Sequence, residues 1–210
     1  MFITFEGIDG SGKSTQIERT ARWLKSLGWD VLVSREPGGS ELGEVIRDIL
    51  LDPRWKAMTG RAEFLLYSAS RAQLVEEIVC PHLVKQKAVV ILDRYDDSST
   101  AYQGGGRELG IERIEQINAF ATGGLIPDVS FVLDVDWETS QSRQRDSRSS
   151  PDRLEQNAHD FFERVRQAYH ELSNLHPGRI VLLDGTKSAD EVFARIQSRL
   201  CPFLDVRMTE

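Results

Sequence analysis

The chain has 210 residues, of which 40% are hydrophobic and 28% are charged, and it carries 16 glycines. This composition is typical of a globular protein with a full hydrophobic core, and it argues against collagen, coiled coil or disorder. Lys and Arg number 26 against 33 Asp and Glu, a net charge of −7, so a nucleic-acid partner would require a local basic patch.

Short apolar segments alternate along the chain with longer segments of helical periodicity. Strands are expected at 1–5, 31–33, 89–92, 129–135 and 180–183. Helices are expected at 14–27, 40–51, 61–83, 111–121, 158–172 and 189–200, the third bent or broken near Cys80-Pro81. Uniformly apolar strands interleaved with helices predict an α/β fold, a five-stranded parallel sheet flanked by helices on both faces.

Residues 143–153 interrupt this alternation. The segment is polar and basic, and it contains Ser149-Ser150-Pro151. It lies within the alternating pattern, and the chain has no internal repeat or low-complexity tract, so a linker between two domains is disfavoured. We therefore expect one domain over residues 1–210 with a short mobile lid at 143–153.

Cysteine usage and the length of apolar runs indicate the compartment. Cys80 and Cys201 lie far apart without a C-x-x-C pattern, which predicts neither a disulfide framework nor a zinc cluster. The longest apolar run, 88–92, is too short to span a bilayer, and residues 1–6 lack the basic region of a signal peptide. A reduced, cytoplasmic protein is expected, without a membrane or nucleic-acid partner.

A phosphate-binding loop is predicted where the first strand meets the first helix. Residues 7–14 read G-I-D-G-S-G-K-S, which fits G-x-x-x-x-G-K-[ST] in the strand–loop–helix context that this motif requires. Glycines let backbone N–H groups converge on an anion at a helix N-terminus. Lys13 would bridge the β- and γ-phosphates and the Ser14 hydroxyl would bind Mg²⁺. The predicted ligand is a nucleoside triphosphate, contacted by Gly7, Ile8, Asp9, Gly10, Ser11, Gly12, Lys13, Ser14 and Thr15.

The loop alone does not distinguish a kinase from a GTPase or a motor. A GTP switch would carry N-K-x-D for guanine and D-x-x-G for the γ-phosphate. No Asn in the chain is followed by Lys, and the only D-x-x-G is Asp9 to Gly12, within the loop itself. A GTP-dependent switch is therefore the less favoured alternative.

Polar residues at the ends of other strands predict a second anion site. Asp93 and Arg94 follow the third expected strand, and Arg35 follows the second. The carboxyl ends of parallel strands meet at one edge of a sheet, where Asp93 would position Mg²⁺ and the two arginines would hold phosphoryl oxygens. Tyr67 and Arg71 lie one helical turn apart, so a ring and a planar donor would face one cavity and suit a nucleobase.

A series of motifs runs in order from Phe5 to about Leu172. They read F-E-G-x-D-G-S-G-K-S-T, R-E-P-G-G, L-L-Y-S-A-S-R-A-Q, D-R-Y, S-S-T-A-Y-Q-G-G-G-R, P-D-V-S-F-V-L-D-V and D-R-L-E-Q. In order and spacing they resemble the bacterial thymidylate kinases. R-E-P-G and A-Y-Q-G-G-G-R beside a phosphate loop are far more specific to that family than the loop alone.

The resemblance implies a P-loop kinase that transfers the γ-phosphoryl group of ATP to dTMP, with Mg²⁺, giving dTDP and ADP. By this likeness Arg71 would hydrogen-bond thymine, and Tyr67, where the family usually has Phe, would stack on it. Arg35 and Arg94 would hold the dTMP phosphate.

The sugar would be contacted by a further set of residues, again by resemblance. Asp9 would accept a hydrogen bond from the 3′-hydroxyl. Tyr102 would crowd the 2′ carbon and so reject ribose, because a ring there leaves an extra hydroxyl neither room nor partner. Ser98 and Gln103 would line the same pocket.

Both substrates are anions, so catalysis requires charge neutralisation as well as alignment. The loop has no cation beyond Lys13, and in the family such a loop accompanies arginines supplied by the lid. The expected catalytic groups are Asp9, Lys13, Arg94, Arg143, Arg148 and Arg153. Asp146 interrupts the lid arginines, which leaves open the one that reaches ATP.

Another acceptor remains an alternative. A kinase of the same fold would act on a different monophosphate or on a deoxynucleoside, although Arg35 and Arg94 favour a substrate that already bears phosphate. The resemblance also implies a homodimer. The apolar faces of a long helix such as 61–83 would supply either its interface or part of the core.

Overall fold

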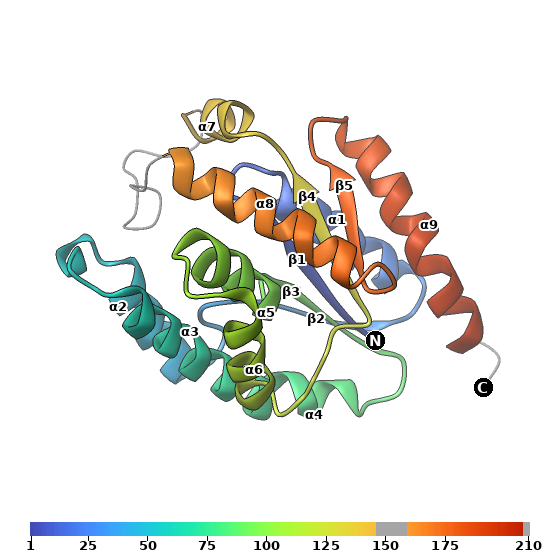
Figure 1. Cartoon of the computed structure of the whole chain (residues 1–210). Helices are drawn as coiled ribbons and strands as arrows, with labels where there is room; N and C mark the ends of the chain where they lie inside the picture. The colour runs from blue at the N-terminus through green and yellow to red at the C-terminus, as the bar shows by residue number, and fades with distance from the viewer. Residues whose placement is uncertain (146–158, 208–210) are drawn as a thin grey trace.

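The strands form one parallel sheet in the order β2-β3-β1-β4-β5. The computed structural model describes residues 1–145 and 159–207. Its strands are β1 (Phe2–Glu6), β2 (Asp30–Arg35), β3 (Ala88–Asp93), β4 (Val129–Asp134) and β5 (Ile180–Asp184). In the centre of the sheet, Ile3 of β1 lies between Ile91 of β3 and Val129 of β4. The predicted fold class is confirmed (Figure 1).

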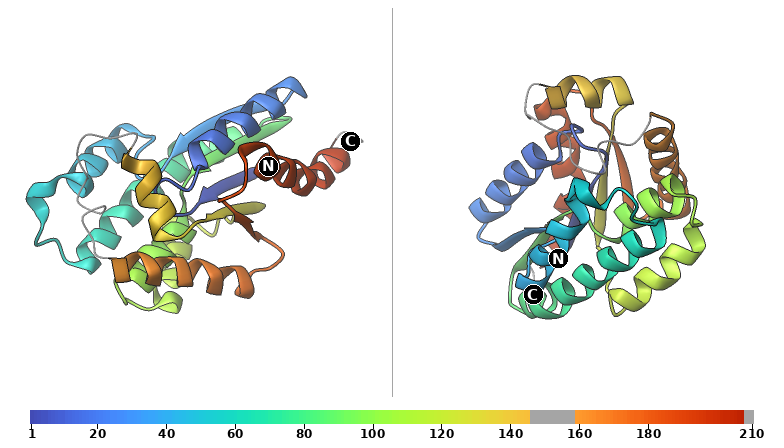
Figure 2. Two further views of the ribbon diagram at one scale, coloured as in Figure 1. Left: turned by 90° about the horizontal axis from the view of Figure 1, so that it is seen from above. Right: turned by 90° about the vertical axis from the view of Figure 1, so that its left-hand side faces the viewer.

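Helices cover both faces of this sheet (Figure 2). They are α1 (Lys13–Ser26), α2 (Glu41–Leu51), α3 (Gly60–Leu74), α4 (Cys80–Leu83), α5 (Asp96–Ser99), α6 (Ile111–Ala121), α7 (Trp137–Arg145), α8 (His159–Leu175) and α9 (Ala189–Arg207). One face is covered by α1 and α9, and the opposite face by a layer that includes α3, α6 and α8. None of the described helices combines the length and apolar content that a bilayer crossing requires.

Alternating side chains of β1 supply both halves of the core. Ile3 and Phe5 are fully buried among apolar residues of α1 and α9. Phe2 packs on the opposite side with Leu74 and Tyr95, because successive side chains of a strand point to opposite faces. A strand buried on both faces reads as an unbroken apolar run, which is why the sequence showed it clearly.

The long helix expected at 61–83 does not break at Cys80-Pro81. It continues from α3 through a π-helical turn at Val75–Val79 into α4. Pro81 directly follows this turn, as the second residue of α4. The irregularity therefore lies one turn before the proline, in a wider turn of a type common at functional sites.

The glycine-rich stretch is helical, which the sequence did not suggest. A π-helical segment, Thr100–Gly106, follows α5 directly. A Cβ at Gly105 would lie 2.6 Å from the Cβ of Ala168, and one at Gly106 would lie 2.6 Å from the Phe161 ring. These glycines allow α8 to pack against the segment, so their role here is close approach between elements. The short helix α7 was also not expected.

Candidate active site

The loop between β1 and α1 has the conformation of an anion cradle. Gly7, Gly10 and Gly12 have φ values of 124°, 76° and 100°, in the left-handed region that favours glycine. A Cβ at Gly7 would lie 2.5 Å from the carbonyl oxygen of Leu133. Gly12 caps α1 without a side-chain hydrogen bond, which leaves backbone N–H groups of the first turn available to an anion.

Lys13 is folded back onto this loop. Its Nζ donates to the carbonyl oxygens of Gly7 and Ile8, at 3.0 and 3.1 Å, and lies 3.9 Å from Asp9 Oδ1. Burial, with a further contribution from the nearby Arg94 cation, lowers the pKa of Lys13 to about 8. The ammonium group is thus held inside the loop by weak carbonyl partners that a phosphate would replace.

Ser14 and Asp93 line the cavity above the loop. Asp93 ends β3, and its Oδ1 is buried with no hydrogen-bond partner among the described residues. An orphaned carboxylate oxygen and a hydroxyl that line the same cavity suit a hard cation such as Mg²⁺. No group of three or more His, Cys, Asp or Glu side chains that could hold a metal occurs within residues 1–145 and 159–207, so phosphate oxygens and water would have to complete the coordination.

Arg94 links the loop to a second cavity. It follows β3 with φ of 71°, and its Nη1 donates to the Gly7 carbonyl at 2.8 Å. Its Nη2 donates to Asp9 Oδ1 at 2.9 Å, and the guanidinium carbon lies 5.1 Å from the centre of the Tyr102 ring. A strained backbone conformation held by such contacts is common at functional sites.

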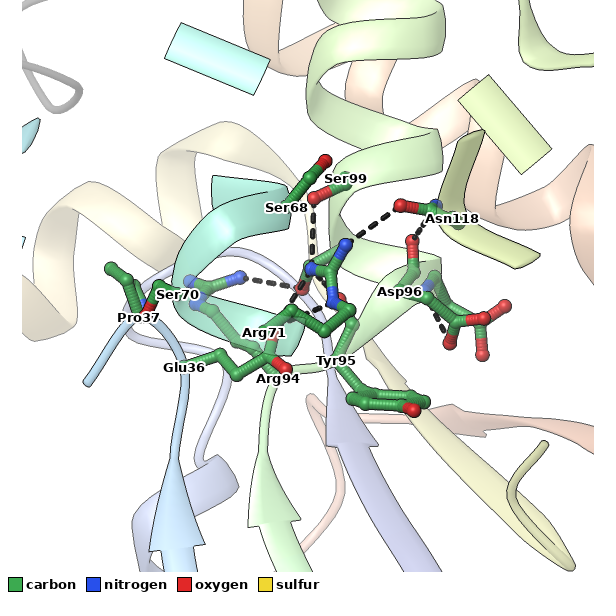
Figure 3. Close-up of polar contacts among 12 residues, drawn as sticks. Glu36, Pro37, Ser68, Ser70, Arg71, Arg94, Tyr95, Asp96, Ser99 and Asn118 are labelled. Atoms are coloured by element: carbon green, nitrogen blue, oxygen red, sulfur yellow. Dashed lines mark hydrogen bonds and ion pairs between the residues drawn. The ribbon is translucent and has the colours of Figure 1, made fainter. Parts of the chain in front are cut away.

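Arg71 is the centre of a buried polar cluster in the second cavity (Figure 3). The side chain is 1% exposed. It donates to Glu36 Oε2 at 2.8 Å, to Asn118 Oδ1 at 2.7 Å, and to the Tyr95 carbonyl and Ser99 Oγ at 3.0 and 2.9 Å. Burial raises the pKa of Glu36, although Arg71 acts in the opposite direction. Such a buried pair depends on both of its charges.

The two cavities share part of their lining. The first, the phosphate cavity, is lined by the loop together with Arg35, Asp93 and Arg143. The second, the acceptor cavity, brings together the predicted residues Asp9, Tyr67, Arg71, Arg94, Ser98, Tyr102 and Gln103. Asp9, Glu36, Arg47 and Arg94 line both. The arrangement places two neighbouring cavities with arginine in their linings at the carboxyl edge of the sheet.

Arg35 and the lid arginines are placed differently from the other predicted residues. Arg35 lines the phosphate cavity rather than the acceptor cavity, half-exposed, with its Nη2 2.8 Å from Glu44 Oε2. Arg143 lies on α7 and donates to the carbonyls of Gly10 and Gly185, so the start of the segment expected to be a lid is helical. Arg148 and Arg153 lie outside the described residues.

Three features of the site were missed in the sequence. Arg47 of α2 lines both cavities and donates to the Pro37 carbonyl at 2.9 Å. Gly185 and Lys187, after β5, line a third cavity beside the loop together with Arg143; the rule that ligands bind at the carboxyl ends of strands could have found them. Arg47 has no local signal because its position depends on how α2 packs.

Glu6 is the third. It is fully buried at the end of β1, accepts the Tyr95 N–H at 2.9 Å and also accepts the Ser98 hydroxyl. Burial, with repulsion from Asp97, raises the pKa of Glu6 to about 8. Glu6 therefore orients a residue of the acceptor cavity from beneath the sheet edge.

In sequence and in architecture the chain is similar to known thymidylate kinases. The family model "Thymidylate kinase" matches residues 5–196. The thymidylate kinase of Thermosipho africanus is 50% identical over 94% of this chain and 96% of that protein, and that of Halothermothrix orenii is 46% identical over 95% and 96%. A crystal structure of thymidylate kinase from Ehrlichia chaffeensis superposes with a TM-score of 0.76, at 31% identity over 95% of this chain and 97% of the other.

Proposed function

This chain belongs to the thymidylate kinase family, and from that premise we propose how its two joined cavities transfer the γ-phosphoryl group of ATP to dTMP. The observation that carries the proposal is the shared wall of the cavities, where Asp9 and Arg94 face both. A donor phosphate chain in one cavity and an acceptor phosphate in the other would meet at this wall. Phosphoryl transfer requires such an in-line approach.

The donor would occupy the phosphate cavity and the cavity beside it. Backbone N–H groups of the loop would hold the β- and γ-phosphates, with Lys13 exchanging its carbonyl partners for phosphate oxygens. The nucleoside would lie toward Arg143 and Lys187, which line the third cavity. Mg²⁺, held by Ser14 and Asp93, would neutralise phosphate charge.

The acceptor would place its base against Tyr67 and Arg71 and its phosphate toward Arg94 and Arg47. Arg35 would reach the same phosphate from the neighbouring cavity after exchanging Glu44 for it, because the two groups now form an exposed pair that costs little to break. Tyr102 and Asp9 would contact the sugar.

Catalysis would then consist of alignment and charge neutralisation. Lys13 and Arg94 both lie beside Asp9 Oδ1, at 3.9 and 2.9 Å, so positive charge surrounds the wall between the cavities. As the γ-phosphoryl group moves, these donors follow the developing charge without large reorganisation. Arg148 and Arg153 would add charge from the lid proposed at 143–153 and would exclude water from the closed site.

The assay that tests this proposal measures ADP formation with ATP, Mg²⁺ and a panel of dTMP, dUMP, dCMP, dGMP and AMP. We expect the highest kcat/KM for dTMP. Preference for another monophosphate would replace the acceptor in the proposal, and turnover with thymidine but not dTMP would indicate a deoxynucleoside kinase. Binding of GTP without transfer to any acceptor would indicate a switch.

We also propose a homodimer, supported by apolar side chains on one helical face. Leu42, Val45 and Ile49 of α2 are 51%, 56% and 38% exposed, and they recur at the spacing of one helix face. Leu65 of the adjacent α3 is 58% exposed. An apolar stripe of this kind is typical of an interface. Sedimentation equilibrium should give twice the chain mass, and Val45→Glu should give monomer.

We propose the cytoplasm as the compartment. Cys80 and Cys201 form no disulfide, as expected in a reducing environment, and the substrates ATP and dTMP are small charged molecules that do not cross bilayers unaided.

A further inference from the structure

A buried carboxylate outside the described cavities contacts one wall of the acceptor cavity. Glu63 of α3 is fully buried, and its Oε1 accepts a hydrogen bond at 2.8 Å from Nε2 of Gln103, which is 1% exposed. Gln103 lines the acceptor cavity, whereas Glu63 does not. The two residues lie 40 positions apart, so the contact joins α3 to the π-helical segment Thr100–Gly106.

The neighbours of Glu63 are hydrogen-bond donors, the partners that an ionised carboxylate requires. Arg107 donates from Nη2 to Glu63 Oε2 at 3.2 Å and from Nε to Oε1 at 3.3 Å. Glu63 also lies in the first turn of α3, where the helix dipole stabilises negative charge. An ionised carboxylate only accepts hydrogen bonds. The Gln103 amide therefore has to turn its nitrogen toward Glu63, which leaves its carbonyl oxygen for a ligand.

Arg71 supplies the opposite polarity in the same cavity. A guanidinium group has five N–H donors and no acceptor. Nε is used by Glu36, both Nη2 hydrogens by Tyr95 and Ser99, and one Nη1 hydrogen by Asn118. Within residues 1–145 and 159–207 the second Nη1 hydrogen has no partner, so it is the donor that Arg71 has left for a ligand.

We propose that Glu63 is a positioning residue that sets which pyrimidine base the acceptor cavity accepts, by fixing the Gln103 amide with its carbonyl oxygen toward the base. The cavity then presents one fixed acceptor and one fixed donor. Thymine and uracil match this pair, because N3–H donates and O4 accepts. Cytosine opposes it at both atoms, since its N3 accepts and its N4 amino group donates. The inference rests on the proposed position of the base beside Tyr67 and Arg71.

The substitution Glu63→Gln tests this mechanism while preserving side-chain shape. A glutamine at position 63 both donates and accepts, so the Gln103 amide is no longer held in one orientation. The ratio of kcat/KM for dTMP to that for dCMP should fall about tenfold, the scale of one matched polar pair exchanged for a mismatched one. The change should lie mainly in KM, with kcat for dTMP nearly unchanged.

Two further variants separate positioning from a general structural effect. In a Gln103→Leu background, Glu63→Gln should no longer alter the ratio, because Glu63 acts through the amide that has been removed. Glu115→Gln removes a carboxylate of α6 that pairs with His176 away from the cavities, and it should leave the ratio unchanged. The proposal would be overturned if Glu63→Gln changed the dTMP-to-dCMP ratio as much in the Gln103→Leu background as in the natural protein. It would also be overturned if Glu115→Gln changed the ratio by the same factor.

The outcome for the unchanged protein distinguishes this inference from the proposed function. If the natural chain does not phosphorylate dTMP, the proposed function fails. If it does, but Glu63→Gln keeps the dTMP-to-dCMP ratio within twofold, only the role of Glu63 fails. If thermal denaturation shows that the Glu63→Gln protein is not folded, Gln103→Met tests the role of the Gln103 carbonyl oxygen without altering α3. It should lower the ratio about tenfold by removing the acceptor, and an unaltered ratio would contradict the proposal.

Discussion

The acceptor cavity and the phosphate cavity hold their charges in opposite ways. In the acceptor cavity, Arg71 and Glu36 are almost completely buried, and four of the arginine's N–H groups are already satisfied by protein. In the phosphate cavity, Lys13 rests on backbone carbonyls and Arg35 on an exposed carboxylate. The first set is fixed before any ligand binds, and the second has partners that a phosphate can displace.

This difference matches what the proposed ligand of each cavity requires. A base is recognised by the positions of a few donors and acceptors, so rigid groups discriminate best. A triphosphate is recognised by charge, which several mobile cations neutralise together. Substitutions in the acceptor cavity should therefore affect folding stability and specificity, whereas substitutions around the phosphates should affect rate.

The largest effect is expected from Arg71→Met. Removing the cation leaves Glu36 buried without its partner, which should cost about 3–5 kcal/mol of the free energy of unfolding. Urea denaturation measures this loss. The double variant Glu36→Gln, Arg71→Met should have a free energy of unfolding closer to that of the natural protein than Arg71→Met alone. A loss below about 1 kcal/mol would contradict this contrast, because it would show that the Arg71–Glu36 pair contributes no more than an exposed pair such as Arg35–Glu44.

Next in size is Arg148→Ala, which should lower kcat by about 10²-fold, the scale of one lost preorganised donor. Its unfolding transition should not move, in contrast to Arg71→Met. The same kinetic measurement on Arg143→Ala and Arg153→Ala serves for comparison. An unchanged kcat for Arg148→Ala would assign the role to one of these two arginines.

Tyr102→Ala tests whether the acceptor cavity excludes ribose by shape. Tyr102 is 7% exposed and packs edge-on against Phe161. Without the ring, UMP should compete with dUMP about tenfold better, because one added hydroxyl is only weakly excluded by an open apolar pocket. The ratio of kcat/KM for dUMP and UMP gives the answer, with Tyr102→Phe as the control that retains the ring. If discrimination survives in Tyr102→Ala, another group excludes ribose.

The smallest effect, a halving at about pH 8, concerns the pH dependence of the rate. Because the pKa of Lys13 is lowered to about 8, its ammonium group is charged below that pH and loses its proton above it. We expect kcat/KM for ATP to be halved at about pH 8 and to fall up to tenfold for each further unit. Lys13→Arg keeps its charge and should lack this decline, although its overall rate is lower.

Glu6, whose pKa is also raised to about 8, titrates in the same range and needs a control. Glu6→Gln should keep the alkaline decline, since it leaves Lys13 in place. Loss of the decline in Glu6→Gln, or its persistence in Lys13→Arg, would assign it to a group other than Lys13.

Local sequence determined most of the elements and the phosphate loop. Apolar runs in the sequence indicated the buried strands. For example, β3 was predicted at 89–92, and in the structure it spans Ala88–Asp93. The G-x-x-x-x-G-K-S pattern specified a loop whose left-handed glycines the structure contains. Both signals lie within a few consecutive residues, which is why one sequence sufficed to read them.

Only the tertiary structure decided which distant residues meet. The contacts from Arg71 to Glu36 and from Gln103 to Glu63 span 35 and 40 positions, and both depend on where α3 packs. The helical form of the glycine-rich segment likewise depends on α8 packing against Gly105 and Gly106. Periodicity and motifs encode conformation over one or two turns of the chain. The burial and the pairing of side chains depend instead on how the elements pack, and burial and pairing decide the charge, polarity and stability of the site.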